Sequence, residues 1–215
     1  MTFEQVMERD EHAVIISSDP GPVSSAVTAT YVTVDRGVVE MRILGAWYLT
    51  NLSWAEPFPY PWVSDVLDHC KNLGTFFFAY ERVRCSYGSN VGATVMDTAT
   101  MSGDLRRAFR PHVSGIYAIA SSDWRHALTG QGNARTPQVK GSLHEFFEGF
   151  GGGADAYKGT KKQPGPWWPI VLAGAKRPGD KGSNIEHLID ALGVAAGLTR
   201  MRFRSGKDPE IYRTF

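Results

Sequence analysis

Three runs of β-branched and aromatic residues follow one another between residues 27 and 52: VTATYVTV (27–34), VVEMRIL (38–44) and AWYLTNL (46–52). Such residues favour strands because their side chains pack well on the pleated surface of a sheet. Asp35-Arg36-Gly37 separates the first two runs and has the composition of a hairpin turn. We therefore expect this part of the chain to form consecutive strands of a β-sheet.

Further strands follow through the rest of the chain, with short helices inserted between them. Further strands are predicted at 75–87, from 90–94 onward, and at 112–122, 167–174 and 199–204. Short helices are predicted at 3–11, 62–72, 102–109, from Ser142, and at 184–192, with capping boxes at Thr2–Gln5, Ser142–Glu145 and Ser183–Glu186. The segment SSDPGPVSS (17–25) is predicted to interrupt regular structure.

These segments predict a mainly β fold, an eight-stranded jelly-roll β-sandwich with short inserted helices. Residues 1–25 would form an N-terminal helix and linker, and residues 26–215 one jelly-roll domain. A chain of 215 residues with 42% hydrophobic residues can bury a core without disulfides or metals. Cys70 and Cys85 form neither a metal-ligand spacing nor a disulfide framework. No apolar run reaches the roughly 18 residues of a spanning helix, so we expect a soluble protein with no membrane partner.

No residue pattern typical of a catalytic site stands out. None of the six histidines has a second histidine at a metal-binding spacing. Gly149–Gly153 follows a predicted helix and lacks the Gly-Lys-Ser/Thr sequence of phosphate-binding loops. Ser122–His126 gathers polar residues but lacks a nucleophile elbow. We therefore predict no catalytic residues and no enzymatic activity.

Positive charge is concentrated in the C-terminal part of the chain. Residues 156–207 contain ten Lys/Arg against three Asp/Glu, whereas residues 1–60 contain three against eight. In a strand over 199–204, every second side chain would share a face at a spacing close to that of phosphates in an extended single strand. The residues predicted to contact RNA or a neighbouring subunit are Arg82, Arg84, Arg200, Arg202, Arg204, Lys161 and Lys162. The alternative is a solvated outer face whose charges protect a sheet edge.

Acidic residues give one candidate metal site. Asp97 and Asp104 flank a turn-rich stretch and could share a Ca²⁺ ion at a subunit interface, because Ca²⁺ prefers carboxylate oxygens. Alternatively, Asp104 is an acidic residue in the first turn of a helix, where the helix dipole favours it. No other cofactor is expected. Glu81 interrupts the apolar alternation of the strand at 75–87, and only a bulge or a local ion pair would explain it.

The stretch FPYPWVSDVLDHCKNLGTFFFAYERVRCSYGSNVGATVMD (58–97) resembles the shell domain of coat proteins from small positive-strand RNA plant viruses of tombusvirus and sobemovirus type. The matching residues are Phe58, Trp62, Ser64, Tyr80, Val83, Cys85, Tyr87 and Gly92–Asp97. LRRAF, SSDWRHALTG and AGLTRMRFRSGKDPEIY extend the resemblance over residues 26–212. Its size and single-domain form are most similar to an ourmiavirus-type coat protein, although the acidic N-terminus departs from the basic arm of the family.

The resemblance implies a viral coat protein that assembles with many copies of itself into an icosahedral-type shell around single-stranded RNA. Its location would be the virion, and the host cytoplasm during assembly. Two other functions stay open. One is a small α+β enzyme or ligand-binding domain with a pocket near Trp167, Trp168 and His126. The other is a viral or phage assembly factor that binds no RNA.

Overall fold

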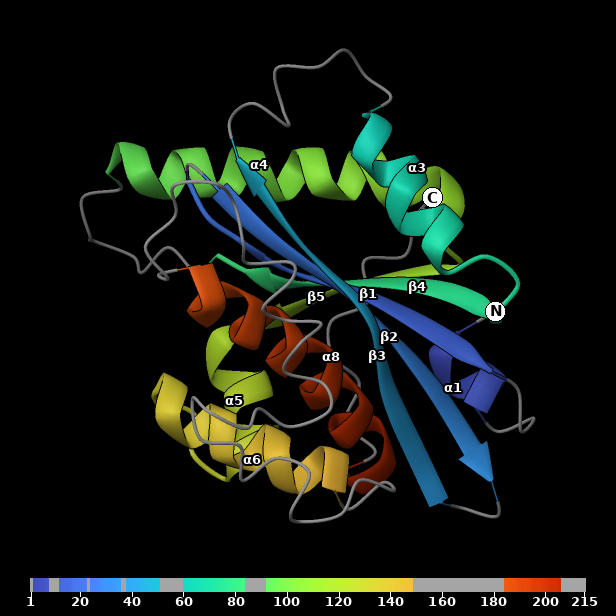
Figure 1. The fold of residues 1–215 in the computed structure, drawn as a ribbon. Helices are drawn as coiled ribbons and strands as arrows, with labels where there is room; N and C mark the ends of the chain where they lie inside the picture. Colours follow the sequence, from blue (N-terminus) through green and yellow to red (C-terminus); the bar gives the residue numbers. More distant parts are fainter. Residues whose placement is uncertain are drawn as a thin grey trace, which may run out of the picture.

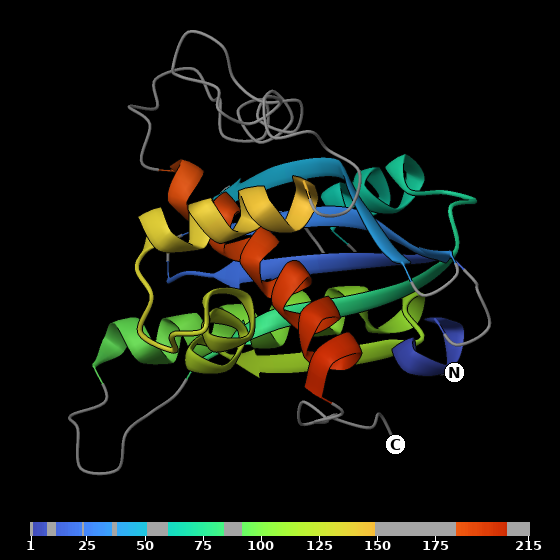
Figure 2. The ribbon, with the colours of Figure 1, turned by 90° about the horizontal axis from the view of Figure 1, so that it is seen from below.

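The computed structural model describes residues 2–7, 12–22, 24–35, 38–50, 60–83, 92–148 and 184–205. These residues form a five-stranded sheet with the order β3-β2-β1-β4-β5 and helices on both of its faces (Figure 1, Figure 2). Its strands are β1 (Ala13–Pro20), β2 (Ser24–Asp35), β3 (Val38–Thr50), β4 (Thr75–Arg82) and β5 (Gly115–Ala120). β2 pairs antiparallel with β1 and β3, whereas β1, β4 and β5 run parallel to one another.

The central strand, β1, is buried on both faces. Its first four residues, Ala-Val-Ile-Ile, are apolar without alternation, as expected of a strand covered on both sides. Ile15 belongs to the core on one face of the sheet, and Ile16 belongs to the core on the other. The prediction that residues 17–25 interrupt regular structure is wrong, because β1 continues to Pro20 and β2 begins at Ser24.

The hairpin predicted around residues 35–37 is confirmed by the pairing of Asp35 with Val38. The predicted strands at 38–44 and 46–52 are one continuous strand, β3, over Val38–Thr50. The register of β3 against β2 shifts beside Ala29 and Thr30, so that Leu44 has no partner opposite it. A one-residue bulge of this kind bends a strand without ending it.

Helices divide between the two faces of the sheet. One face carries α1 (Phe3–Met7), α5 (Ser121–Thr129), α6 (Thr136–Glu148) and α8 (Asn184–Ser205), whose apolar side chains form one core. The other carries α3 (Pro61–His69) and α4 (Ala93–Phe109), which is followed by a short 3₁₀ helix at Arg110–His112. Figure 2 shows α8 lying between α6 and the sheet. Among the described helices, none combines the length and apolarity that crossing a membrane would require.

The predicted eight-stranded jelly roll is wrong, because the described residues form a single mixed sheet covered by helices. Two predicted strands are helical where the structure describes them: residues 93 and 94 begin α4, and 199–204 is the last part of α8. The alternation of apolar and basic residues at 199–204 spans too few residues to distinguish a strand from a helix. Nearly every residue from Leu188 to Thr199 is buried, and α8 is therefore a core helix.

Some local predictions are confirmed. The capping box at Thr2–Gln5 forms, with the Thr2 amide donating to Gln5 Oε1 at 2.9 Å and the Gln5 amide donating to Thr2 Oγ1 at 3.3 Å. The proline-led amphipathic helix is α3, and its buried residues are Trp62, Val63 and Val66. The predicted strand at 167–174 lies outside the described residues.

Two glycines allow α8 to approach α5 closely. A Cβ atom at Gly193 would overlap the ring of Trp124, and one at Gly197 would lie 2.7 Å from Trp124 Cβ. Trp124 is fully buried and is the largest side chain in this core. The indole therefore fills the space that the missing side chains of Gly193 and Gly197 leave open.

Gly193→Ala is expected to lower the free energy of unfolding by about 1–3 kcal/mol, because the added methyl group forces Trp124 or α8 to move. Gly103→Ala in α4 is the matched control, since an added Cβ there meets nothing within 4 Å. The control should raise stability by up to about 1 kcal/mol through helix propensity. Urea denaturation measures both, and equal effects would contradict the packing argument.

Candidate functional site

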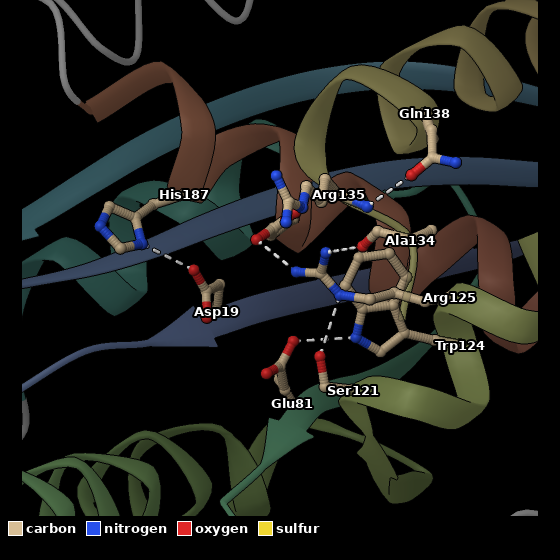
Figure 3. Close-up of polar contacts among 10 residues, drawn as sticks. Asp19, Glu81, Ser121, Trp124, Arg125, Ala134, Arg135, Gln138 and His187 are labelled. Atoms are coloured by element: carbon tan, nitrogen blue, oxygen red, sulfur yellow. Dashed lines mark hydrogen bonds and ion pairs between the residues drawn. The ribbon is translucent and has the colours of Figure 1, made fainter. Parts of the chain in front are cut away.

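Two acidic residues lie beside each other at the carboxyl ends of the central parallel strands. In the β1–β4 pair Ser18 is opposite Tyr80, which brings Asp19 and Glu81, the next residue of each strand, to neighbouring positions. Both occupy the alternate positions of their strands whose other side chains enter the core beneath α8. Figure 3 shows the two carboxylates close to each other on this face of the sheet.

A third carboxylate comes from α8, which packs against β1 and β4. The Asp190 side chain is 17% exposed and that of Asp19 is 14% exposed. The charge of Asp190 is close enough to raise the pKa of Glu81. Three elements distant in sequence thus bring together Asp19, Glu81 and Asp190, which we call the carboxylate cluster.

Burial and mutual repulsion raise pKa values in the carboxylate cluster. Burial is the main cause that raises the pKa of Glu81 to about 7, and the charges of Asp19 and Asp190 add to it. Burial also raises the pKa of Asp190 to about 6, with Arg125 opposing and Asp19 adding. Above these values the cluster holds several negative charges in a partly desolvated place, an arrangement that a bound cation would stabilise.

Two basic side chains contact the carboxylate cluster (Figure 3). His187 Nδ1 lies 2.7 Å from Asp19 Oδ2, and this hydrogen bond is the main cause that raises the pKa of His187. Arg125 Nη2 donates to Asp190 Oδ2 at 2.8 Å. His187 and Asp190 are three residues apart on α8 and therefore share a face of the helix. The imidazole is 47% exposed, so the cluster reaches solvent on the side of His187.

The donor set of the carboxylate cluster fits a divalent metal ion such as Mg²⁺ or Mn²⁺, for which carboxylate oxygens are suitable ligands. Asp190 Oδ1 supports this fit, because it is buried and accepts no hydrogen bond. As the side chains stand, no three His, Cys, Asp or Glu residues in the described part of the chain are grouped tightly enough to hold an ion. Binding would therefore draw the three carboxylates closer together than they stand.

Those predicted basic residues that the structure describes lie on two different elements, β4 and α8. Arg82 follows Glu81 on β4 and points to the opposite face of the sheet. Arg200 and Arg202 lie on α8: Arg200 Nη1 donates to the Leu128 carbonyl oxygen at 3.2 Å, and Arg202 forms an ion pair with Glu4. Arg204 is near the end of α8. Arg84, Lys161 and Lys162 lie outside the described residues, and the proposed contacts of the whole set stay predictions.

Among the described residues, the other predicted site residues do not belong to the carboxylate cluster. Asp97 and Asp104 both lie on α4, two turns apart or about 10 Å along the helix axis, and shared Ca²⁺ binding by them stays a prediction. His126 is an exposed residue of α5. Trp167 and Trp168, predicted to line a pocket with it, lie outside the described residues.

Sequence reasoning missed all three members of the carboxylate cluster, although each left a signal. Glu81 was the unexplained charge in an apolar strand, and the structure shows that it accepts a hydrogen bond from Trp124 Nε1 at 2.9 Å. Asp19 comes two serines after the apolar run Ala13–Ile16 and precedes a proline and a glycine, which suggested a linker. Asp190 interrupts the apolar residues of α8, which is a weak signal without knowledge of the strands that face it.

Comparison with known proteins gives a fold likeness only. No family model matches the chain. No curated protein matches it either. A solved structure of Thermus thermophilus RuvC is similar, with a TM-score of 0.53, 19% identity, and coverage of 88% of this chain and 95% of that one. A second, T. thermophilus RuvC in complex with Holliday junction substrate, has a TM-score of 0.50, 18% identity, and coverage of 91% and 99%.

These findings correct the interpretation drawn from the sequence. The resemblance to viral coat proteins is wrong, because the similar solved structures are RuvC proteins with a different fold from a jelly roll. The predictions of a shell-forming function, of no enzymatic activity and of a virion location are contradicted with it. The alternative of a small α+β enzyme agrees better with the findings. At 18–19% identity, the likeness shows that this chain shares the fold of RuvC.

Proposed function

We propose that this protein is a divalent-metal-dependent nuclease that hydrolyses phosphodiester bonds at the carboxylate cluster. The observation that carries the proposal is the convergence of three partly buried carboxylates, Asp19, Glu81 and Asp190, at the carboxyl ends of parallel strands, where the pKa values of Glu81 and Asp190 are raised. Like charges held together away from water reduce stability. Titratable groups with shifted pKa values are concentrated at functional sites, where the chemistry requires them. If the role were purely structural, one carboxylate paired with one arginine would be more stable than three carboxylates that repel one another.

The residues of the cluster supply oxygen ligands from three rigid elements. Asp19 and Glu81 are held by the β1–β4 pairing, and Asp190 is held by α8. When bound there, divalent ions would stabilise the charge that develops on the phosphate and make water a stronger nucleophile. Ligands on strands and helices keep their positions better than ligands on loops, which suits a reaction that depends on in-line geometry.

His187 is placed to move a proton at the solvent side of the cluster. When Nδ1 carries a hydrogen and donates it to Asp19 Oδ2, the other ring nitrogen, Nε2, is the basic atom. Nε2 can then accept the proton of an attacking water molecule. The hydrogen bond to Asp19 orients the ring and stabilises the imidazolium that results.

DNA is the substrate that the likeness favours. One of the similar structures holds a Holliday junction substrate, which is a four-way DNA junction. Phosphodiester hydrolysis itself uses the backbone, which all nucleic acids share, so the cluster does not by itself select a branched form. Junction DNA and linear duplex DNA are therefore the two substrates to compare.

Asp19→Asn, Glu81→Gln and Asp190→Asn are each expected to lower the rate of Mg²⁺- or Mn²⁺-dependent DNA cleavage by at least about 100-fold, because each removes a charged metal ligand. The measurement is cleavage of end-labelled junction and linear duplex DNA by the full chain. Asp97→Asn is the control, since Asp97 is an exposed carboxylate on α4. Full activity of all three cluster variants, or no metal-dependent cleavage by the natural protein, would refute the proposal.

Glu81→Gln is also expected to stabilise the protein at pH 8. The pKa of Glu81 is about 7 in the folded chain and ordinarily 4.5, so its contribution to stability is complete below pH 4.5 and is lost as the pH rises through 7. Glutamine stays neutral and still accepts the hydrogen bond from Trp124. The gain at pH 8 should be about 1–3 kcal/mol and should disappear near pH 4.5.

Urea denaturation at both pH values measures this difference, and Mg²⁺ should stabilise the natural protein more than Glu81→Gln at pH 8. A loss of stability at pH 8 would show instead that ionised Glu81 holds the fold together. Gain of stability with loss of activity is the result expected for a functional carboxylate.

A further inference from the structure

Two consecutive residues of α5 contact two different members of the carboxylate cluster. Trp124 Nε1 donates to Glu81 Oε2 at 2.9 Å, and Arg125 Nη2 donates to Asp190 Oδ2 at 2.8 Å (Figure 3). α5 begins at Ser121, directly after β5, and β5 pairs with β4 beside Glu81. The first turns of α5 therefore start next to the cluster, with no connecting loop.

The guanidinium group of Arg125 is held on several sides. Besides the contact with Asp190, Nε donates to Ser121 Oγ at 3.0 Å and Nη1 donates to the Ala134 carbonyl oxygen at 2.6 Å. The guanidinium also lies 4.5 Å from the centre of the Trp124 ring. Its side chain is 16% exposed. These contacts use each nitrogen of the group, so Arg125 is placed to hold Asp190 and not to reach a phosphate.

The indole of Trp124 is equally constrained. It is fully buried between the sheet and α8, against Gly193 and Gly197. Asp190, Gly193 and Gly197 are spaced by three and four residues and so lie on one face of α8. The close approach that the glycines permit is therefore the same contact that brings Asp190 to Arg125.

We propose that Trp124 and Arg125 are positioning residues that set the distance between Glu81 and Asp190 for metal binding by the carboxylate cluster. The inference rests on the proposed function. Neither side chain touches the reacting atoms: each holds one oxygen of its carboxylate and leaves the other to a metal ion. The contacts of Asp190 support this role, because Oδ2 accepts a hydrogen bond from Arg125 while Oδ1 is buried with no hydrogen bond.

The choice of variants follows from these contacts. Arg125→Lys keeps the positive charge but cannot make the hydrogen bonds to Ser121, Ala134 and Asp190 together. Trp124→Phe keeps a buried aromatic ring and removes the Nε1–H donor. Arg42→Lys is the control for Arg125, since the Arg42 guanidinium also lies near an aromatic ring, 5.6 Å from the centre of the Tyr31 ring, but on β3. Trp62→Phe is the control for Trp124, since Trp62 is a buried tryptophan on the opposite face of the sheet.

The first experiment is calorimetric titration of the full chain with Mn²⁺ alone, without DNA. Arg125→Lys and Trp124→Phe should weaken Mn²⁺ binding by about 10–100-fold, as is typical when a residue that orients a metal ligand is removed. In cleavage assays at fixed Mn²⁺ both should lower kcat and leave the KM for DNA unchanged, because neither touches the substrate. The two control variants should change neither the Mn²⁺ affinity nor kcat, even if they change the thermal midpoint of unfolding.

Mn²⁺ affinity and kcat that stay at the natural values in Arg125→Lys and Trp124→Phe would overturn the positioning role and leave the proposed function standing. A raised KM for DNA with unchanged Mn²⁺ affinity would also overturn it, because Arg125 would then be a phosphate contact. Failure of the natural protein itself to bind Mn²⁺ or to cleave DNA would overturn the proposed function, and the positioning role with it.

Discussion

The parallel pairing of β1 with β4 is the contact on which the rest of the site depends. A parallel pair brings the carboxyl ends of two strands to the same edge of the sheet, and here each strand carries one acidic residue at that end, Asp19 and Glu81. Helices must cover both faces of these buried strands. Once α8 covers one face, Asp190 is placed over the same pair. A slip of one residue in the β1–β4 register would separate the two strand carboxylates and turn one of them away from α8.

The carboxylate cluster is a compromise between stability and chemistry. Three carboxylates in a partly buried place repel one another, and the protein offsets part of that repulsion with His187 and Arg125. The offset is incomplete, since burial, with the repulsion added to it, keeps the pKa of Glu81 raised to about 7 and that of Asp190 to about 6. A metal ion would complete it.

The sequence predicted local structure well where the signal was local. The capping box at Thr2–Gln5, the hairpin around residues 35–37 and helix α3 all depend on residues close together in the chain. Prediction of secondary structure from the sequence failed where a segment was short or was covered by other elements on all sides. Residues 199–204 alternate apolar and basic residues like a strand, yet they form the end of α8. The helical pattern was missed because α8 contacts the sheet, α5 and α6 and therefore has no single polar face. The resemblance to coat proteins rested on aromatics, glycines and prolines, which many sheets share.

The capacity to bury a core, the β2–β3 hairpin and the unexplained charge of Glu81 in an apolar strand could be inferred without a structure, because these properties depend on residue type and near neighbours. Only the tertiary structure decided that Asp19, Glu81 and Asp190 meet. Residues so distant in the chain become neighbours through strand order and helix packing, which no local pattern records. The same holds for Trp124 and Arg125, whose role depends on the close approach of α8 that Gly193 and Gly197 permit.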